Sequence, residues 1–187
     1  MQKLKLRSQL KIALSQIPKQ EMEKQSLLVC KKVMMHDAYK RASRVSVYVN
    51  MDSEVDTTIL IKDILQSGKV CFIPHYEGEL MQMVRLPNWS DYVALSKNKD
   101  GIKQSSSTSI NMNQSSDSTG GLDLIILPGL GFTENGGRLG RGKGHYDTFI
   151  KRQVKRPYLM GIAFSQQILP SVPMMKHDEF LDEVISE

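Results

Sequence analysis

The pattern of apolar and polar positions begins with helical spacing. Apolar residues recur every three or four positions as far as Pro18, which predicts an N-terminal helix with one buried face. The members of this face are Leu6, Leu10, Ala13, Leu14 and Ile17. Three basic residues, Lys3, Arg7 and Lys11, recur on another face, and spacing alone favours a solvated basic surface there. A second helix is predicted over residues 21–39, whose methionines are expected to fill the core.

After the second helix the pattern changes to short β-branched and apolar runs. Residues 44–50 (RVSVYVN) predict a strand, and residues 57–66 predict a helix that stops at Gly68. Residues 69–73 predict the next strand, ended by Pro74. This order is one βαβ unit, so we expect a parallel sheet with right-handed crossovers. Further strands are predicted at residues 79–85, 122–127, 158–164 and 183–186, and a further helix at residues 146–152.

Residues 98–121 are rich in Ser, Asn and Gly. Such a segment cannot bury enough apolar area to offset its ordering entropy, so we expect a long surface loop. Too little chain lies on either side for two independent cores, which argues against a domain boundary. The sequence therefore predicts a single α/β domain over residues 1–187, built in three layers, with a mostly parallel central sheet flanked by helices.

Composition narrows the class of protein. Of the 187 residues, 40% are hydrophobic and 24% are charged, which is the balance of a globular chain. The formal net charge of +5 favours anionic partners, but 6% aromatic residues leave few stacking platforms for single-stranded nucleic acid. Cys30 and Cys71 have neither metal-ligand nor redox spacing, and the sequence contains no signal-peptide or membrane-helix pattern. We therefore expect a soluble cytoplasmic protein.

Residues 127–149 (LPGLGFTENGGRLGRGKGHYDTF) carry most of the candidate chemistry. The segment follows an apolar strand and precedes a helix, where α/β folds bind ligands outside the carboxyl ends of their strands. Its glycines let the backbone approach a ligand closely, and Arg138, Arg141 and Lys143 stand between them. Backbone N–H groups, a helix N-terminus and three cations together favour a polyphosphate ligand.

Two other interpretations of this segment stay open. Residues 137–144 approach the P-loop pattern GxxxxGK[ST], but Gly144 lacks the hydroxyl that would bind Mg²⁺, and the match lies well past the strand. A mobile glycine-rich surface loop is the plainer alternative. Against it, three neighbouring cations would repel one another in the absence of an anion.

The run PGLGF…GxRLGRGKGxYD closely resembles the signature of the 5-formyltetrahydrofolate cyclo-ligase family, also called methenyltetrahydrofolate synthetases. The N-terminal Lys-x-x-x-Arg spacing, the segment MDSEVDT and the segment HDEFLDEV match in the same order, so the resemblance covers nearly the whole chain. It implies one α/β domain with a Rossmann-like sheet. It also implies an enzyme that closes 5-formyltetrahydrofolate to 5,10-methenyltetrahydrofolate, with ATP as co-substrate and Mg²⁺ as the metal.

The resemblance further implies roles for individual residues. Those implied for ATP binding are Lys3, Arg7, Arg138, Gly140, Gly142, Lys143 and Gly144. Those implied for substrate binding are Val49, Met51, Glu54, Arg141, Gly142, Lys143, Gly144 and His145. The residues implied for catalysis are Arg141, Lys143 and Tyr146, and those implied as Mg²⁺ ligands are Asp147 and Asp178.

Several of these roles have a plainer structural alternative. Lys3 and Arg7 could form only a solvated face. Glu54 could cap the helix that follows it, and Asp147 could cap the helix after the glycine-rich segment, since Asp is frequent at helix N-termini. Asp178 could be a solvated acid in a C-terminal turn.

Two features depart from the family pattern. His145 stands where the family usually has Tyr, and a His ring keeps a donor but can also carry charge. The serine-rich loop lacks the Trp and prolines that the family tends to place beside the folate, and its apolar residues are scarce, Ile102 and Ile110 among them. Folate affinity would then be weaker than is typical, or another residue supplies that wall.

Two other functions compete with this one. A different ATP-dependent transferase or a sugar-phosphate enzyme would share the basic glycine-rich segment but would not need Glu54 or Asp178. A nucleic-acid-binding module is disfavoured because the cations cluster with glycines in one loop. We expect reduced folate and ATP as partners, no nucleic-acid or membrane partner, and a monomer. The remaining histidines, expected at the surface or in local hydrogen bonds, are His36, His75 and His177.

Overall fold

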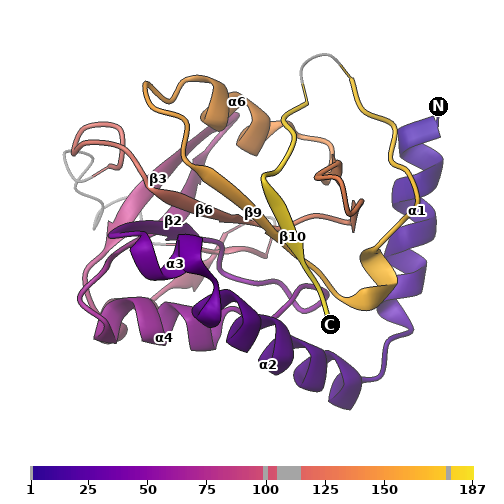
Figure 1. The fold of residues 1–187 in the computed structure, drawn as a ribbon, viewed down its shortest axis with the longest axis horizontal. Helices are drawn as coiled ribbons and strands as arrows, with labels where there is room; N and C mark the ends of the chain where they lie inside the picture. The colour runs from indigo at the N-terminus through magenta and orange to yellow at the C-terminus, as the bar shows by residue number, and fades with distance from the viewer. Residues whose placement is uncertain (1, 99–100, 105–114, 176–177) are drawn as a thin grey trace.

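The structure is a computed structural model that describes residues 2–98, 101–104, 115–175 and 178–187. A central sheet has helices on both faces, and α1 stands beside it (Figure 1). The helices are α1 (Gln2–Ser15), α2 (Lys19–Met35), α3 (Asp37–Arg41), α4 (Thr58–Gln66), α5 (Trp89–Val93), α6 (His145–Lys151) and the 3₁₀ turn η2 (Ser165–Gln167). The strands are β1 (Arg44–Val47), β2 (Val70–Glu77), β3 (Leu80–Leu86), β4 (Ser96–Lys97), β5 (Lys103–Gln104), β6 (Leu124–Leu127), β7 (Gly131–Phe132), β8 (Arg138–Leu139), β9 (Tyr158–Ile162) and β10 (Glu183–Ile185).

The main sheet has the strand order β10-β9-β6-β1-β2-β3. Every neighbouring pair is parallel except β2 and β3, so the predicted mostly parallel α/β fold is confirmed. All four residues of β6 are buried, because helices cover both faces of a parallel sheet, and this explains its unbroken apolar sequence. The chain proceeds outward from β1 in one direction and from β6 in the other. A crevice therefore opens at the carboxyl ends of β1 and β6, where α/β folds bind ligands.

Two hydrophobic clusters lie on opposite faces of this sheet. On one face, α2 and α4 contribute Val33 and Ile64 to a cluster that includes Ile73 of β2. On the other face, α6 contributes Phe149 to a cluster that includes Ile125 of β6. The predicted three layers of helix, sheet and helix follow from these two clusters.

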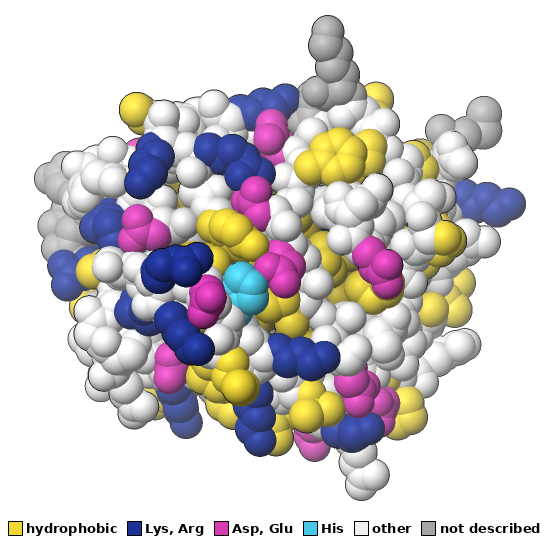
Figure 2. Space-filling model, in the orientation of Figure 1, with side chains coloured by type: hydrophobic (Ala, Val, Ile, Leu, Met, Phe, Trp, Pro, Cys, Tyr) yellow, Lys and Arg dark blue, Asp and Glu magenta, His cyan; other side chains and the backbone are white. Residues whose placement is uncertain are grey.

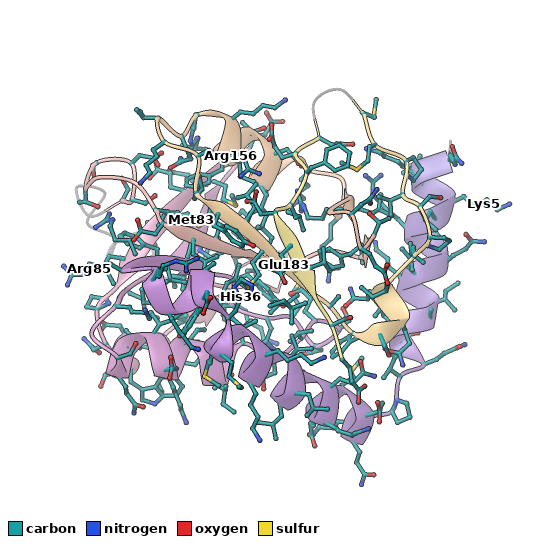
Figure 3. The ribbon with its side chains drawn as sticks, viewed as in Figure 1. Lys5, His36, Met83, Arg85, Arg156 and Glu183 are labelled. Carbon is teal, nitrogen blue, oxygen red and sulfur yellow. The ribbon has the colours of Figure 1, made fainter. Side chains whose placement is uncertain are left out.

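The predicted helix over residues 21–39 is wrong in its length, because it breaks at His36. The backbone of His36 is extended (φ −70°, ψ 138°), and its Nδ1 accepts the N–H of Ala38 at 3.1 Å, which caps the start of α3. Its Nε2 lies 2.7 Å from Glu183 Oε2, and Figure 3 shows the two side chains between α3 and β10. Periodicity cannot detect a one-residue break, but the expected local hydrogen bonding of His36 is confirmed.

The strand predicted to end at Pro74 instead continues through it, as β2 (Val70–Glu77). The ladder between β1 and β2 ends at Phe72, so Pro74 pairs only with Met83 of β3. A proline is tolerated on a strand edge that no neighbouring strand uses, because no ladder bond needs its missing N–H. The first strand is also shorter than predicted, since β1 ends at Val47.

The prediction of a surface loop over residues 98–121 is wrong at the C-terminal end of this segment. Ser115 and Ser116 are buried, and Ser115 forms a β-bridge with Val84. At its N-terminal end the segment joins the small hairpin of β4 and β5. Half of the segment, residues 99–100 and 105–114 with Ile110, lies outside the described residues.

His75 contradicts the expectation of a surface histidine. It lies on β2 opposite Gln82 of β3, and its exposed fraction is 6%. Burial lowers the pKa of the imidazole, and within the described part of the chain Nδ1 has no hydrogen-bond partner. His177 lies outside the described residues.

The surface carries charges of both signs. Figure 2 shows Lys and Arg side chains interspersed with Asp and Glu on the face that includes α2, α3 and β10. A nucleic-acid-binding face would instead gather positive charge. Across the described ranges, no helix combines the length and apolar character needed to cross a bilayer.

Candidate active site

A pocket of about 540 Å³ opens at the carboxyl ends of β1 and β6. Its walls come from α1, the segment after β1, strand β2, the turn between β8 and α6, and the C-terminal segment. It brings together every residue to which a site role was assigned from the sequence. These are Lys3, Arg7, Val49, Met51, Glu54, Arg138, Gly140, Arg141, Gly142, Lys143, Gly144, His145, Tyr146, Asp147 and Asp178. All of these residues thus line one pocket, while the role of each stays a prediction.

The glycine-rich segment is folded as a hairpin and not as a mobile loop. β7 and β8 pair antiparallel, and Leu139 is only 1% exposed. Gly136 turns the hairpin at a φ of +86°, and a Cβ at this position would collide with the backbone oxygen of Leu181. The helix α6 begins directly after Gly144, whose φ is +69°. The P-loop alternative is therefore wrong, because the buried strand β8 occupies its start, and the surface-loop alternative is wrong for β7 and β8. Residues 141–144 are exposed.

Arg138 is a buried cation in the pocket wall, with an exposed fraction of 7%. Its Nη2 donates to Asp147 Oδ2 at 2.9 Å, and its Nη1 donates to the carbonyl oxygen of Pro128 at 3.3 Å. Its guanidinium carbon lies 5.7 Å from the centre of the Tyr146 ring. Among the described residues Nε has no hydrogen-bond partner. Arg138 thus holds a fixed positive charge, and its Nε–H is available as a donor to a ligand.

Asp147 connects α6 to the C-terminal segment. Its Oδ1 accepts the N–H of Glu179 at 3.2 Å, while its Oδ2 pairs with Arg138. The residue that caps α6 is Gly144, so the capping interpretation of Asp147 is wrong. A carboxylate that pairs with a buried guanidinium both neutralises it and fixes its direction.

The basic face of α1 lines the pocket. Arg7 Nε donates to the carbonyl oxygen of Gly140 at 2.9 Å, which holds the turn after β8 against the helix. Lys3 Nζ lies 2.5 Å from Asp178 Oδ2, and the two side chains are 19% and 13% exposed. Asp178 Oδ2 also accepts the N–H of Met175 at 2.7 Å. The solvated alternatives are therefore wrong for Lys3, Arg7 and Asp178.

Glu54 and Arg141 form an ion pair in the pocket. Arg141 donates to Glu54 Oε1 from Nε at 3.1 Å and from Nη2 at 2.9 Å. Glu54 Oε2 accepts the N–H of Met51 at 2.9 Å, and its side chain is 8% exposed. The residue that caps α4 is Thr57, so the capping interpretation of Glu54 is wrong.

Four aromatic residues line the pocket, namely Tyr48, Tyr76, His145 and Tyr146. The rings of Tyr76 and His145 lie 5.2 Å apart between centroids, with their planes at 40°. The hydroxyl of Tyr146 is buried and interacts with that of Tyr76, but no described atom meets hydrogen-bond geometry with it. Burial raises the pKa of Tyr76 to about 12 and raises the pKa of Tyr146 well above its ordinary value. Both hydroxyls are therefore protonated donors at neutral pH.

The pocket favours an anionic ligand. Six basic and three acidic side chains line it, and a concave wall of one dominant sign concentrates the field. In the described ranges, no group of three or more His, Cys, Asp and Glu side chains could hold a metal ion by itself. A metal would therefore need further ligands from a bound molecule.

Sequence reasoning missed part of the pocket wall. The residues without an assigned role are Lys11, Tyr48, Pro74, Tyr76, Ile102, Pro128, Gly129 and Met175. Pro128 and Gly129 follow the apolar strand in the quoted run, so their place after β6 could have been found. The place of Tyr76 in the pocket wall depends on the extension of β2 past Pro74, and the strand had been predicted to end there.

Comparison with known proteins identifies the family. A model of the 5-formyltetrahydrofolate cyclo-ligase family matches residues 1–187. The chain is 44% identical to the 5-formyltetrahydrofolate cyclo-ligase of Mus musculus, over 97% of this chain and 92% of the mouse protein. It resembles the solved 5,10-methenyltetrahydrofolate synthetase of Aquifex aeolicus with a TM-score of 0.80 and 26% identity, over 99% of this chain and 89% of that one. A synthetase from Mycoplasma pneumoniae is similar in fold, with a TM-score of 0.74 and 17% identity, over 100% of this chain and 99% of that one. The chain therefore belongs to the 5-formyltetrahydrofolate cyclo-ligase family.

Proposed function

We propose that this chain converts 5-formyltetrahydrofolate to 5,10-methenyltetrahydrofolate in a reaction that consumes ATP, requires Mg²⁺ and releases ADP and phosphate. The observation that carries the proposal is the convergence of every residue implied by the family motif on one pocket. We also propose that residues 1–187 act as one catalytic domain, because that pocket draws on both ends of the chain.

ATP binds, in this proposal, with its phosphates between α1 and the turn at residues 140–144. Lys3, Arg7 and Lys143 surround that region with positive charge. The glycines of the turn let backbone N–H groups approach phosphate oxygens, and α6 begins where the turn ends. Arg138 adds a buried charge that does not have to reorganise during the reaction.

Mg²⁺ accompanies the nucleotide. In nucleotide sites this ion is usually held by one or two carboxylates together with phosphate oxygens and waters. Asp147 and Asp178 line the same pocket and supply two carboxylates, so the donor set fits, and each carboxylate now pairs with a cation. When bound, the ion neutralises phosphoryl charge.

The reduced folate occupies the part of the pocket beside Glu54. A nearly buried carboxylate can accept paired hydrogen bonds from the N–H groups on the edge of a pterin ring. Val49 and Met51 supply apolar wall, and the ring of His145 packs against the ligand. The backbone of residues 142–144 borders both ligands, so it holds the transferring group between them.

Phosphorylation makes the formyl oxygen a leaving group, which it is not as hydroxide or oxide. The formyl oxygen attacks the γ-phosphorus, and the bond to ADP breaks. The neighbouring bridge nitrogen then attacks the formyl carbon and loses its proton, and the carbon–oxygen bond breaks to release phosphate. Arg141 and Lys143 stabilise the moving phosphoryl charge, and the Tyr146 hydroxyl orients the reacting groups.

An absorbance assay for the methenyl product tests the proposal. Purified protein should form 5,10-methenyltetrahydrofolate only when 5-formyltetrahydrofolate, ATP and Mg²⁺ are all present, with one ADP released per product. Turnover without ATP, or none in the complete mixture, would overturn it. Thermal stabilisation by Mg·ATP but not by RNA would separately exclude a nucleic-acid-binding function.

A further inference from the structure

Beyond Phe72, one edge of strand β2 pairs with no other strand among the described residues. β1 pairs with β2 only from Val70 to Phe72, whereas β2 continues alongside β3 to Glu77. In an antiparallel pair, the N–H and C=O of one residue point to the same side, and that side alternates along the strand. Beyond Phe72, the groups that point away from β3 therefore need a partner from outside the sheet.

The side chain of Gln104 supplies that partner at Tyr76. The N–H of Tyr76 donates to Gln104 Oε1 at 3.1 Å, and Gln104 Nε2 donates to the carbonyl oxygen of Tyr76 at 3.3 Å. One side-chain amide thus satisfies both backbone groups of Tyr76, as a neighbouring strand would. Removing it would leave a half-buried donor and acceptor unpaired.

Gln104 is itself fixed by the hairpin of β4 and β5. Ser96 pairs with Gln104 across the hairpin, and Asn98 Nδ2 donates to Gln104 Oε1 at 3.1 Å. Asn98 also holds the turn, because its N–H donates to the carbonyl oxygen of Ile102 at 2.8 Å and its Oδ1 accepts the N–H of Ile102 at 3.0 Å. Ile102 is therefore tied, through Asn98, to the residue that attaches the hairpin to β2.

The two residues that this attachment fixes both line the pocket. Tyr76 reaches it from β2, where its ring packs with His145, and Ile102 reaches it from the hairpin. We propose that Gln104 is a positioning residue, whose amide holds Tyr76 and Ile102 as a wall for the ring of the reduced folate. The inference rests on the proposed function, because it takes this end of the pocket as the folate end. It also identifies Ile102 as the apolar wall in a loop that lacks the family's Trp and prolines.

Two substitutions separate positioning from a general structural effect. Gln104→Leu removes both hydrogen bonds to Tyr76. Gln104→Glu keeps the acceptor for the Tyr76 N–H but places a second oxygen, in place of the donor, near the Tyr76 carbonyl. Gln153→Leu is the matched control, because Gln153 also donates to a backbone carbonyl, that of Phe149 at 3.3 Å, and its partners are not pocket residues.

Titration calorimetry gives the affinity of each variant for 5-formyltetrahydrofolate and for Mg·ATP, and the absorbance assay gives kcat and both KM values. We expect each Gln104 variant to lose about tenfold in folate affinity, as for the loss of one or two hydrogen bonds, with Mg·ATP affinity within about twofold. The control should change neither affinity. A Gln104 residue that only supports the fold would instead weaken the binding of both ligands together.

Folate affinity within about twofold of wild type in either folded Gln104 variant would overturn the inference. So would an equal loss of affinity for both ligands. If Gln104→Leu fails to fold, the near-isosteric Gln104→Glu decides alone. Wild-type protein that binds folate without turnover would contradict the proposed reaction and leave the Gln104 comparison intact.

Discussion

Arg141 donates two hydrogen bonds to a single oxygen of Glu54, at 3.1 and 2.9 Å, although each residue is assigned to substrate binding. The second oxygen of Glu54 accepts the N–H of Met51. Both oxygens of the carboxylate that we propose for the pterin edge are therefore already hydrogen-bonded within the protein. On this proposal, folate binds Glu54 only at the expense of the hydrogen bonds from Arg141. A bound anion that pairs with the Arg141 guanidinium would remove this competition.

The first prediction is that nucleotide and folate bind with positive coupling. A non-hydrolysable Mg·ATP analogue offers phosphate oxygens to Arg141, which frees Glu54, so it should raise folate affinity by about fivefold or more. Glu54→Gln removes the ion pair, so it should weaken folate binding and also reduce this coupling. Calorimetric titration of folate with and without the analogue measures both effects.

Glu134→Gln is the control for this comparison, because Glu134 is exposed in the turn between β7 and β8. It should keep the wild-type coupling. Equal folate affinity with and without the analogue in the wild type would show that the Arg141–Glu54 pair does not compete with substrate.

The second prediction concerns Lys143, an exposed cation in the turn before α6. Lys143→Ala should lower kcat by about 100-fold, the scale for losing one preorganised group that stabilises transferring charge. Its Tm should stay close to that of the wild type, because the side chain is exposed. Lys155→Ala, also at an exposed position, should leave kcat unchanged. Near-normal turnover of Lys143→Ala would show that the lysine does not stabilise the transferring phosphoryl group.

The location of the site followed from the sequence because its determinants are local. Glycines and cations alternate within residues 136–144, and this local pattern alone favoured a turn around an anion over a plain surface loop. The parallel sheet followed from the strand–helix–strand order of residues 44–73, and the apolar run at β6 indicated a central strand, since strands buried on both faces need no polar alternation. Local sequence patterns were thus sufficient to predict both the glycine-rich segment as the site and the fold class.

The contacts that could not be predicted from the sequence depend on pairing between distant segments. The contact between Gln104 and Tyr76 requires the point at which β1 stops pairing with β2, and no local pattern sets that point. The pairing of Asp147 with Arg138 likewise needs the hairpin of β7 and β8, which a run of glycines concealed. Residues that the sequence assigned to separate ligands, such as Arg138 and Asp147, therefore form an ion pair with each other in the structure.

The third prediction follows from that pairing. Asp147→Asn removes the charge proposed to hold Mg²⁺, so the apparent Mg²⁺ requirement should rise severalfold while folate affinity without nucleotide stays similar. It also leaves the buried guanidinium of Arg138 without its counter-ion, at a cost of about 1–3 kcal/mol in the free energy of unfolding. Activity against Mg²⁺ concentration and a denaturant titration measure the two effects.

Asp182→Asn is the control for Asp147, because Asp182 also pairs with an arginine, Arg156, at a more exposed position. Its Mg²⁺ requirement should equal that of the wild type. A stability loss in Asp147→Asn with an unchanged Mg²⁺ requirement would restrict Asp147 to positioning Arg138.

The fourth prediction concerns stability against pH at His75. Burial lowers the pKa of its imidazole in the folded chain, and the charge of Glu77 opposes this only in part. The unfolded chain therefore takes up the proton first as pH falls, near the ordinary value of about 6.5. Because the unfolded state then binds more protons than the folded state, stability is lost as pH drops below that value.

His75→Phe removes both the titrating group and a buried nitrogen without a hydrogen-bond partner among the described residues. Its free energy of unfolding should equal or exceed that of the wild type at pH 8, and the difference in its favour should grow as pH falls to about 5.5. Denaturant titrations of both proteins at several pH values measure this difference, and groups that titrate alike in the two proteins cancel. A difference that is constant across this range would mean that His75 takes up its proton equally in the folded and unfolded chain, so that its burial does not disfavour the charged ring.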